Sequence, residues 1–173
     1  MGNRRAFTLV ELMIVVAIIG VLAALALYGV SRYLKHSKTA EAIANLGSIE
    51  TGSRQQYQRE TPFGGDDNKF VHTFCPSTTL TPATVPLASK IKTVPADWGS
   101  LGWTCLKFNV DSPQFYAYKY ESNSSTGTDA MYTATANGDL DGNGVKSTFE
   151  LSGHGGPLGD AVRDSFRVLQ EDE

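Results

Sequence analysis

The sequence is poor in the residues on which most catalytic and metal sites depend. It has three histidines and two cysteines, and it lacks a G-x-S-x-G nucleophile elbow. His36, His72 and His154 have no evident nucleophile partner along the chain, so no catalytic residue is predicted and the chain is not expected to be an enzyme. A metal site built on His72 and Cys75 would have two ligands without a second pair, which disfavours it.

Positive charge is also scarce. Lysine and arginine number 15 against 18 aspartates and glutamates, which gives a formal net charge of -3. Nucleic-acid binding needs an excess of Lys and Arg, so no nucleic-acid partner is predicted. A local basic cluster follows an apolar run and is interpreted as residues that meet lipid headgroups and solvent; it comprises Arg32, Lys35, His36 and Lys38.

Between Ala6 and Tyr28 the sequence has one ionisable side chain, Glu11. The run is long enough to span a bilayer, because about 20 apolar residues in a helix cover the hydrocarbon core. A carboxylate inside such a run costs about 3 kcal/mol unless it is paired, so Glu11 is expected to have a cationic partner. Arg4 and Arg5 precede the run and predict a cytoplasmic N-terminus, with the chain after Tyr28 exported.

The run differs from an ordinary secretory signal, which has a shorter apolar core without an acid and a cleavage site after that core. Here the small residue at the junction is Ala6, in front of the apolar core. A cut after Ala6 would leave the apolar run on the mature protein. The new α-amine of Phe7 would then be a cation four residues before Glu11.

Two stretches carry a family resemblance, Arg4-Arg5-Ala6-Phe7-Thr8-Leu9-Val10-Glu11-Leu12 and Ala17-Ile18-Ile19-Gly20-Val21-Leu22-Ala23-Ala24. They resemble the class III signal of type IV pilins and pseudopilins, closely over residues 1–30 and more loosely to residue 60. The resemblance implies cleavage after Ala6 by a prepilin peptidase, N-methylation of Phe7, and polymerisation into a helical filament. It also implies that Glu11 neutralises the terminal amine of a neighbouring subunit during assembly.

Two positions depart from the family pattern. Ala6 stands where the family usually has Gly, a small change that the peptidase is expected to tolerate. Tyr28 stands where many pilins have a helix-distorting Pro. We therefore expect either a straighter helix or a break elsewhere, at Gly29.

Proline is absent from Phe7 to Gln58, and helix-forming residues dominate, which predicts one helix of about 50 residues. Its first half is expected to anchor the chain in the membrane before assembly and to form the filament core afterwards. Its second half has apolar residues on roughly one face, as in a helix that packs on a globular core. Those residues are Leu34, Ala40, Ile43, Leu46, Ile49 and Tyr57.

The rest of the chain predicts a sheet, so the expected fold class is α+β and type IV pilin-like, with the long helix on an antiparallel sheet of three or four strands. Turn residues after the helix and five prolines from Pro76 to Pro113 predict a surface loop. Alternating aromatic and β-branched residues predict strands at 104–110, 115–120, 130–136 and 147–151.

The C-terminal residues are expected to lie outside the sheet. Gly153 to Gly156 predicts a flexible turn, and the tail from Gly159 has Val162, Phe166 and Leu169 at helical spacing, as in a short docking helix or a frayed terminus. The expected organisation is a leader at 1–6, an apolar helix at 7–29, an amphipathic half at 30–60, a Pro-rich connection at 61–103, a sheet at 104–152 and a tail at 153–173.

The two cysteines predict a disulfide. Cys75 and Cys105 both lie in the part of the chain expected to be exported, 30 positions apart. The number of cysteines is even, so both can be paired. Closing such a loop is worth about 3 kcal/mol in the chain-entropy model. The bond would attach the Pro-rich connection to the predicted sheet.

Residues 139–150 match the twelve-residue calcium-loop pattern, D-x-D-x-N-G with a glutamate six positions after the glycine. A structural Ca²⁺ would be held by Asp139, Asp141, Asn143, the Val145 carbonyl and Glu150. The flanks are predicted strands, not the two helices of an EF-hand. The alternative is an Asp/Asn/Gly hairpin turn that needs no metal.

Three functions follow from these observations. The favoured one is a major or minor pilin of a surface filament used in adhesion, motility or uptake. Its expected partners are the prepilin peptidase, other pilins, the inner membrane and an inner-membrane assembly platform, with the assembled chain at the cell surface and the precursor's C-terminal domain in the periplasm. The alternatives are a type II secretion pseudopilin and a membrane-anchored periplasmic binding domain that does not polymerise.

Overall fold

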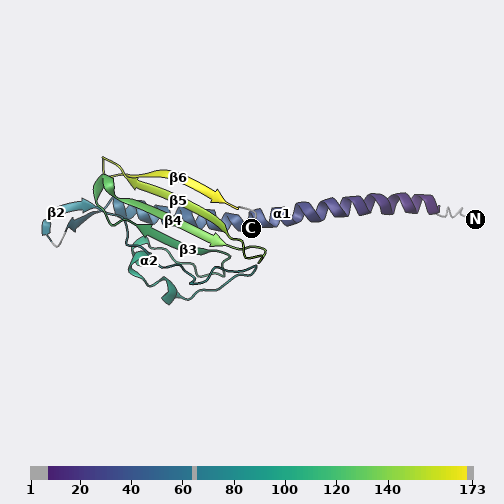
Figure 1. Cartoon of the computed structure of the whole chain (residues 1–173), viewed down its shortest axis with the longest axis horizontal. Helices are drawn as coiled ribbons and strands as arrows, with labels where there is room; N and C mark the ends of the chain where they lie inside the picture. The colour runs from purple at the N-terminus through teal and green to yellow at the C-terminus, as the bar shows by residue number, and fades with distance from the viewer. Residues whose placement is uncertain (1–7, 64–65, 171–173) are drawn as a thin grey trace, which may run out of the picture.

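The computed structural model describes residues 8–63 and 66–170. One long helix, α1 (Leu9–Tyr57), projects from the domain at its N-terminal half and packs on a four-stranded antiparallel sheet with its second half (Figure 1). This confirms the predicted α+β fold. The sheet has the order β3-β4-β5-β6, with bounds Ala117–Ser122, Met131–Gly138, Ser147–Gly155 and Ala161–Leu169. The shorter elements are β1 (Glu60–Phe63), β2 (Asp66–His72), η1 (Pro95–Trp98), α2 (Leu101–Leu106) and η2 (Gly127–Asp129).

Helix α1 is continuous through Tyr28 and Gly29, so the absence of proline leaves no break there. Its first buried residue is Thr39, and buried residues recur at steps of three and four from that point. They are Thr39, Ala42, Leu46, Ile49, Ser53 and Tyr57, and Glu50 next to Ile49 is buried as well. The prediction of one packed face was right for the second half of the helix, but Leu34, Ala40 and Ile43 are exposed. The buried face that begins at Thr39 includes the small Ala42, and its neighbour Ile43 lies outside this face.

Tyrosines of the sheet provide polar contacts to α1. The Tyr118 hydroxyl accepts a hydrogen bond from Asn45 Nδ2 at 2.7 Å, and the Tyr120 hydroxyl lies 2.7 Å from Ser53 Oγ. Burial raises the pKa of both phenols. Both groups therefore stay neutral, and the buried hydroxyls keep hydrogen-bonding partners on the helix.

The first predicted strand, 104–110, is wrong. Residues 101–106 form the short helix α2, capped at its end by Lys107 in the left-handed conformation (φ 53°). Trp103 and Leu106 are buried, and a spacing of three places both on one face of a helical turn. A Cβ at Gly52 of α1 would overlap the carbonyl oxygen of Leu106, so this glycine permits the close approach of the two helices.

The predicted Pro-rich loop is also more ordered than expected at its start. Strands β1 and β2, at residues 60–63 and 66–72, pair antiparallel and extend beyond the end of the sheet opposite the N-terminus (Figure 1). From Thr73 to Val94 the described chain makes isolated bridges and no named strand, as predicted. Two of these bridges join Thr81 to Tyr118 of β3 and Ile91 to Gln114 just before β3, so this part of the connection is held against that edge of the sheet.

The C-terminal prediction of a helix or frayed tail is wrong, because 161–169 is the edge strand β6. Phe166 and Val168 pair with Leu151 and Phe149 of β5, and a register shift lies at Ser152/Gly153. Gly153 and its neighbours to Gly155 belong to β5 and not to a turn. The spacing of the apolar residues resembled a helix because β6 is mostly exposed on both faces and lacks a clean two-residue alternation.

An ion pair attaches β6 to α1. Arg163 Nε donates to Glu50 Oε1 at 2.8 Å, and Arg163 Nη2 also contacts Glu50 Oε2. The Glu50 side chain is 5% exposed, whereas that of Arg163 is 51% exposed. The bidentate contact raises the pKa of Arg163 and compensates a carboxylate that the fold removes from water.

We predict that Arg163→Ala lowers the free energy of unfolding by about 3 kcal/mol, because it leaves the Glu50 charge buried without its partner. The measurement is urea denaturation of the full chain in detergent micelles. A Glu50→Met/Arg163→Met double variant should recover most of the loss. The matched control is Arg167→Ala, an exposed arginine of the same strand, which should change stability by less than about 0.5 kcal/mol. Equal losses in Arg163→Ala and Arg167→Ala would contradict the role of the pair.

Candidate functional site

The most unusual surface in the described chain is the projecting half of α1. Its large apolar side chains are exposed on every side of the helix, from Leu9 (74%) to Leu27 (74%). By length and composition this is the one helix in the described ranges that can cross a membrane, and none of its apolar window is buried within the molecule. So much exposed apolar surface indicates a lipid or protein partner.

Glu11 lies at the start of this surface, where it forms a capping box with Thr8. The Glu11 carboxylate accepts hydrogen bonds from Thr8 N at 2.9 Å and from Thr8 Oγ1 at 2.7 Å, while Glu11 N donates to Thr8 Oγ1 at 3.2 Å. These bonds satisfy donors that a helix leaves unpaired in its first turn. The carboxylate is therefore folded back toward the N-terminal end of the helix.

The sequence analysis did not predict this capping box, although Thr-x-x-Glu before an apolar run is its usual pattern. It gives the Glu11 carboxylate hydrogen bonds but no cation. The expected partner, the amine of Phe7, and the cleavage site at Ala6 lie outside the described residues. The role of Glu11 in neutralising an amine remains a prediction, now with a carboxylate that already faces the right end of the helix.

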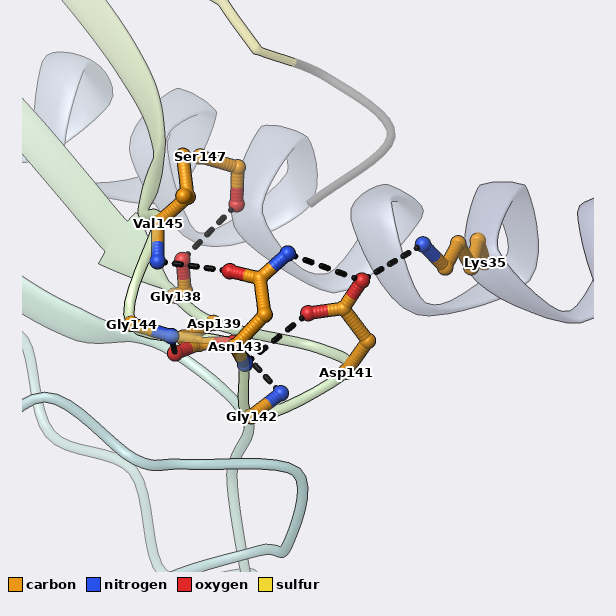
Figure 2. A network of polar contacts seen from close by, with 9 residues as sticks. All are labelled: Lys35, Gly138, Asp139, Asp141, Gly142, Asn143, Gly144, Val145 and Ser147. Atoms are coloured by element: carbon orange, nitrogen blue, oxygen red, sulfur yellow. Dashed lines mark hydrogen bonds and ion pairs between the residues drawn. The ribbon is translucent and has the colours of Figure 1, made fainter.

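The calcium-like loop connects β4 to β5 beside α1 (Figure 2). Asp139 is buried, and its two carboxylate oxygens accept hydrogen bonds from Gly142 N at 2.6 Å and Gly144 N at 2.8 Å. Both glycines have positive φ, 78° and 89°, which favours Gly at these positions. Asp139 thus closes the turn through the backbone.

Asp141 points the other way, toward the helix (Figure 2). Its Oδ2 accepts from Lys35 Nζ at 3.3 Å, and its Oδ1 accepts from Asn143 N at 3.2 Å. Asn143 Oδ1 in turn accepts from Val145 N at 2.6 Å. The contact with Lys35 joins the tip of the loop to α1 just before the helix becomes buried at Thr39.

These residues as arranged do not fit a calcium ion. Glu150 lies in β5 between the buried Phe149 and Leu151, so its side chain projects from the opposite face of the sheet to theirs. Within residues 8–63 and 66–170, no three His, Cys, Asp or Glu side chains form a group that could hold a metal. The geometry is that of the Asp/Asn/Gly turn, with Lys35 supplying a positive charge. The calcium site expected from the sequence, with Asp139, Asp141, Asn143, Val145 and Glu150 as ligands, would form only if this loop rearranged.

The predicted disulfide is present in the structure. Cys75 and Cys105 are bonded, which attaches the connection after β2 to α2 and not to a strand. The disfavoured metal pair does not form, because Cys75 is in the disulfide and His72 Nδ1 lies 2.8 Å from the Tyr57 carbonyl oxygen. His154 lies in β5 with Nδ1 2.6 Å from Asp164 Oδ1, an exposed contact across the β5–β6 pair.

Comparisons with known proteins agree with the geometry of α1. Residues 1–27 match the family model of the prokaryotic N-terminal methylation motif. The chain is 40% identical over 67 residues to the type IV major pilin protein PilA of Myxococcus xanthus (strain DK1622), covering 39% of this chain and 30% of that protein. It is 45% identical over 51 residues to fimbrial protein Q of Moraxella bovis, covering 30% and 32%. No solved structure matches the chain significantly.

A third relative is the type IV major fimbrial protein FimA of Dichelobacter nodosus, 44% identical over 48 residues, or 28% of this chain and 31% of that protein. The chain thus aligns with about a third of the length of these curated relatives. The resemblance to type IV pilins inferred from the leader and apolar run is confirmed.

The contact between Lys35 and Asp141 makes the metal requirement testable. We predict that the melting temperature of the wild-type chain is the same in calcium and in chelator, because Lys35 already supplies the positive charge. In Lys35→Met the carboxylates lose this ammonium, which costs about 0.5–1 kcal/mol, and calcium should then raise the melting temperature. The matched control is Lys119→Met, which removes another exposed pair, with Glu121, away from the loop.

A stabilising effect of calcium on the wild-type chain would contradict this prediction and support the calcium site. Calcium-dependent protease resistance of the wild-type chain that disappears in Asp141→Ala would show that the loop takes metal and releases Lys35.

Proposed function

Because the chain carries the prokaryotic N-terminal methylation motif and is similar to type IV pilins, we propose that it is a major or minor pilin, a structural subunit of a type IV pilus. The observation that carries this proposal is the exposure of the apolar half of α1 with Glu11 at its start. A helix that is apolar on every side is stable in water only when something covers it. In this proposal lipid covers it before assembly and the apolar helices of other copies cover it in the filament.

Processing follows from the same segment. We infer that a prepilin peptidase cuts between Ala6 and Phe7 and that the Phe7 amine is methylated, as the matched motif supports. The precursor would sit in the inner membrane with Arg4 and Arg5 on the cytoplasmic side and the folded domain in the periplasm. An inner-membrane assembly platform would then pass the mature chain into a surface filament used in adhesion, motility or uptake.

In this proposal Glu11 holds two successive roles. It caps α1 through Thr8 in the single chain, and in the filament its charge neutralises the Phe7 amine of a neighbouring copy. The two roles need different chemistry. A capping box accepts Glu or Gln at this position, whereas neutralisation of an amine needs the negative charge of Glu.

We predict that Glu11→Ala and Glu11→Gln are both cleaved normally and both reduce filament yield by about tenfold or more, because each leaves an uncompensated amine in an apolar core. The measurements are the mass of the membrane-bound chain and the yield of sheared filaments. Glu11→Gln is the informative variant, since it keeps the cap and removes only the charge. Normal filaments from Glu11→Gln would show that capping alone accounts for this residue.

The control for processing is Ala6→Phe. A bulky residue before the cut should leave the longer precursor in the membrane, so a loss of filaments without cleavage is distinguished from the loss expected of the Glu11 variants.

A further inference from the structure

Exposed apolar side chains gather at the end of the domain opposite the N-terminus, where β1, β2 and the turn between β5 and β6 lie (Figure 1). We call Pro62, Phe70 and Leu158 the distal patch. Phe70 is 53% exposed and Leu158 is 92% exposed, and Pro62 is exposed as well. Leucine and phenylalanine side chains exposed together are typical of an interaction surface.

The half of the distal patch on β1 and β2 is held in place by α1. Pro62 and Phe70 are direct partners in the antiparallel register, so they share a face of the two-stranded sheet. His72 lies on that face two residues after Phe70. Its Nδ1 lies 2.8 Å from the Tyr57 carbonyl oxygen, and the two rings are 5.5 Å apart between centroids.

The half of the distal patch on the β5–β6 turn packs on the same histidine. A Cβ at Gly159 would lie 2.8 Å from His72 Nε2, so the turn that carries Leu158 passes directly over this ring. Gly156 N donates to the Asp160 carbonyl oxygen at 2.6 Å and closes the turn. Leu158 is thus presented at the tip of a hydrogen-bonded turn beside the face of β2 that carries the rest of the patch.

A second set of exposed apolar side chains lies on the flank of the domain where β6 accompanies α1. We call Ile43, Phe166 and Val168 the lateral patch, and these side chains are 46%, 40% and 36% exposed. Phe166 and Val168 pair with Leu151 and Phe149 of β5, which are buried in the core shared with α1. Cross-strand partners share a face, so both project on the side of the sheet that carries the helix.

The ion pair between Arg163 and Glu50 shows that the three residues of the lateral patch lie at one level. Ile43 precedes Glu50 by two helical turns, about 10 Å on the same side of α1. Phe166 follows Arg163 by three residues, about 10 Å along a strand, and β6 runs toward the projecting half of α1 (Figure 1). A Cβ at Gly47 would meet nothing within 4 Å, so the helix surface beside the patch is open.

The two patches differ in position, and this difference indicates how copies of the chain can join. A contact of one patch with the same patch on a partner closes into a dimer, whereas a contact between two different patches repeats without closing and generates a helical filament. Ile43 precedes Tyr57, at the base of the distal patch, by 14 residues, or about 21 Å of helix. Copies joined through these patches would therefore be displaced by at least about 20 Å along α1, always in the same direction.

We propose that the distal patch of each copy binds the lateral patch of the next copy along the filament, the copy that lies toward its distal end. This inference rests on the proposed function as a pilus subunit and names the surfaces through which the domains meet outside the apolar helices. The shapes agree, because Leu158 protrudes on a turn and Gly47 leaves space on α1. A small contact is sufficient here, since it acts together with the packing of the apolar helices in every copy.

The test is cysteine crosslinking in filaments sheared from cells that express the full chain. The two native cysteines form a disulfide, so an introduced cysteine supplies the free thiol. Filaments of the Leu158→Cys/Phe166→Cys double variant are treated with a short bismaleimide and separated on a denaturing gel. We expect a ladder of dimers, trimers and longer species, whereas each single variant should give monomer alone.

The matched control is Leu101→Cys/Phe166→Cys, because Leu101 is an 81% exposed leucine on α2, away from both patches. This variant should remain monomeric on the gel. Monomer from Leu158→Cys/Phe166→Cys in filaments of normal yield, or equal ladders from both double variants, would overturn the patch contact alone. Dimers from Leu158→Cys would show that the distal patch meets itself and would also overturn it. An unmodified chain that forms no filament would overturn the proposed function, and the inference with it.

A second measurement does not depend on crosslinking. Leu158→Asp places a charge in the contact and should lower the yield of sheared filaments about fivefold or more, whereas Leu101→Asp should leave the yield unchanged. Both side chains are exposed in the single chain, so neither change should lower the melting temperature of the subunit in detergent micelles. Equal filament yields from the two variants would overturn the proposal.

Discussion

The structure depends on one constraint: the first half of α1 has no packing partner among residues 8–63 and 66–170. From Leu9 to Leu27 the large apolar side chains are all exposed, and one charged residue, Glu11, lies at the beginning. Burial of each such side chain is worth about 1.5–3 kcal/mol, so covering this half of the helix with lipid or protein would be strongly favourable. The rest of the molecule is arranged so that this segment stays free and points away from the domain (Figure 1).

The second half of the same helix is held tightly. A stripe from Thr39 to Tyr57 packs on the sheet, and Arg163 attaches the edge strand to Glu50. At the exit of the helix, Asp141 reaches Lys35 from the loop between β4 and β5. Because α1 is unbroken, these contacts fix the direction in which the apolar half projects from the domain. In the proposed filament, the packing of the apolar halves therefore sets the positions of the domains on the outside.

The features predicted correctly from the sequence rest on local signals. The long helix follows from the absence of proline, the membrane-length run from its composition, and the sheet from alternating aromatic and β-branched residues. The disulfide followed from an exported pair of cysteines. The helix, the apolar run and the strands each show their pattern within one segment. The disulfide follows from the expected export of both cysteines to an oxidising compartment.

The features that were missed depend on contacts between distant residues. Lys35 and Asp141 are 106 positions apart, so the spacing in the loop matched a calcium pattern without showing the ammonium beside it. Arg163 and Glu50 are 113 positions apart, and their pair holds β6 as a strand where apolar spacing suggested a helix. Helix α2 has six residues, too few for a period to be recognised. The capping box of Thr8 and Glu11 is the exception, because its signal was local and could have been found.

The most direct test of the account is an electron cryo-microscopy reconstruction of filaments assembled from this chain. We expect the segments from Leu9 to Leu27 of neighbouring copies to fill the filament axis. Each Glu11 carboxylate should lie within about 4 Å of the Phe7 amine of an adjacent copy. A filament with these segments on its outside, or one in which Glu11 contacts only its own Thr8, would contradict the account.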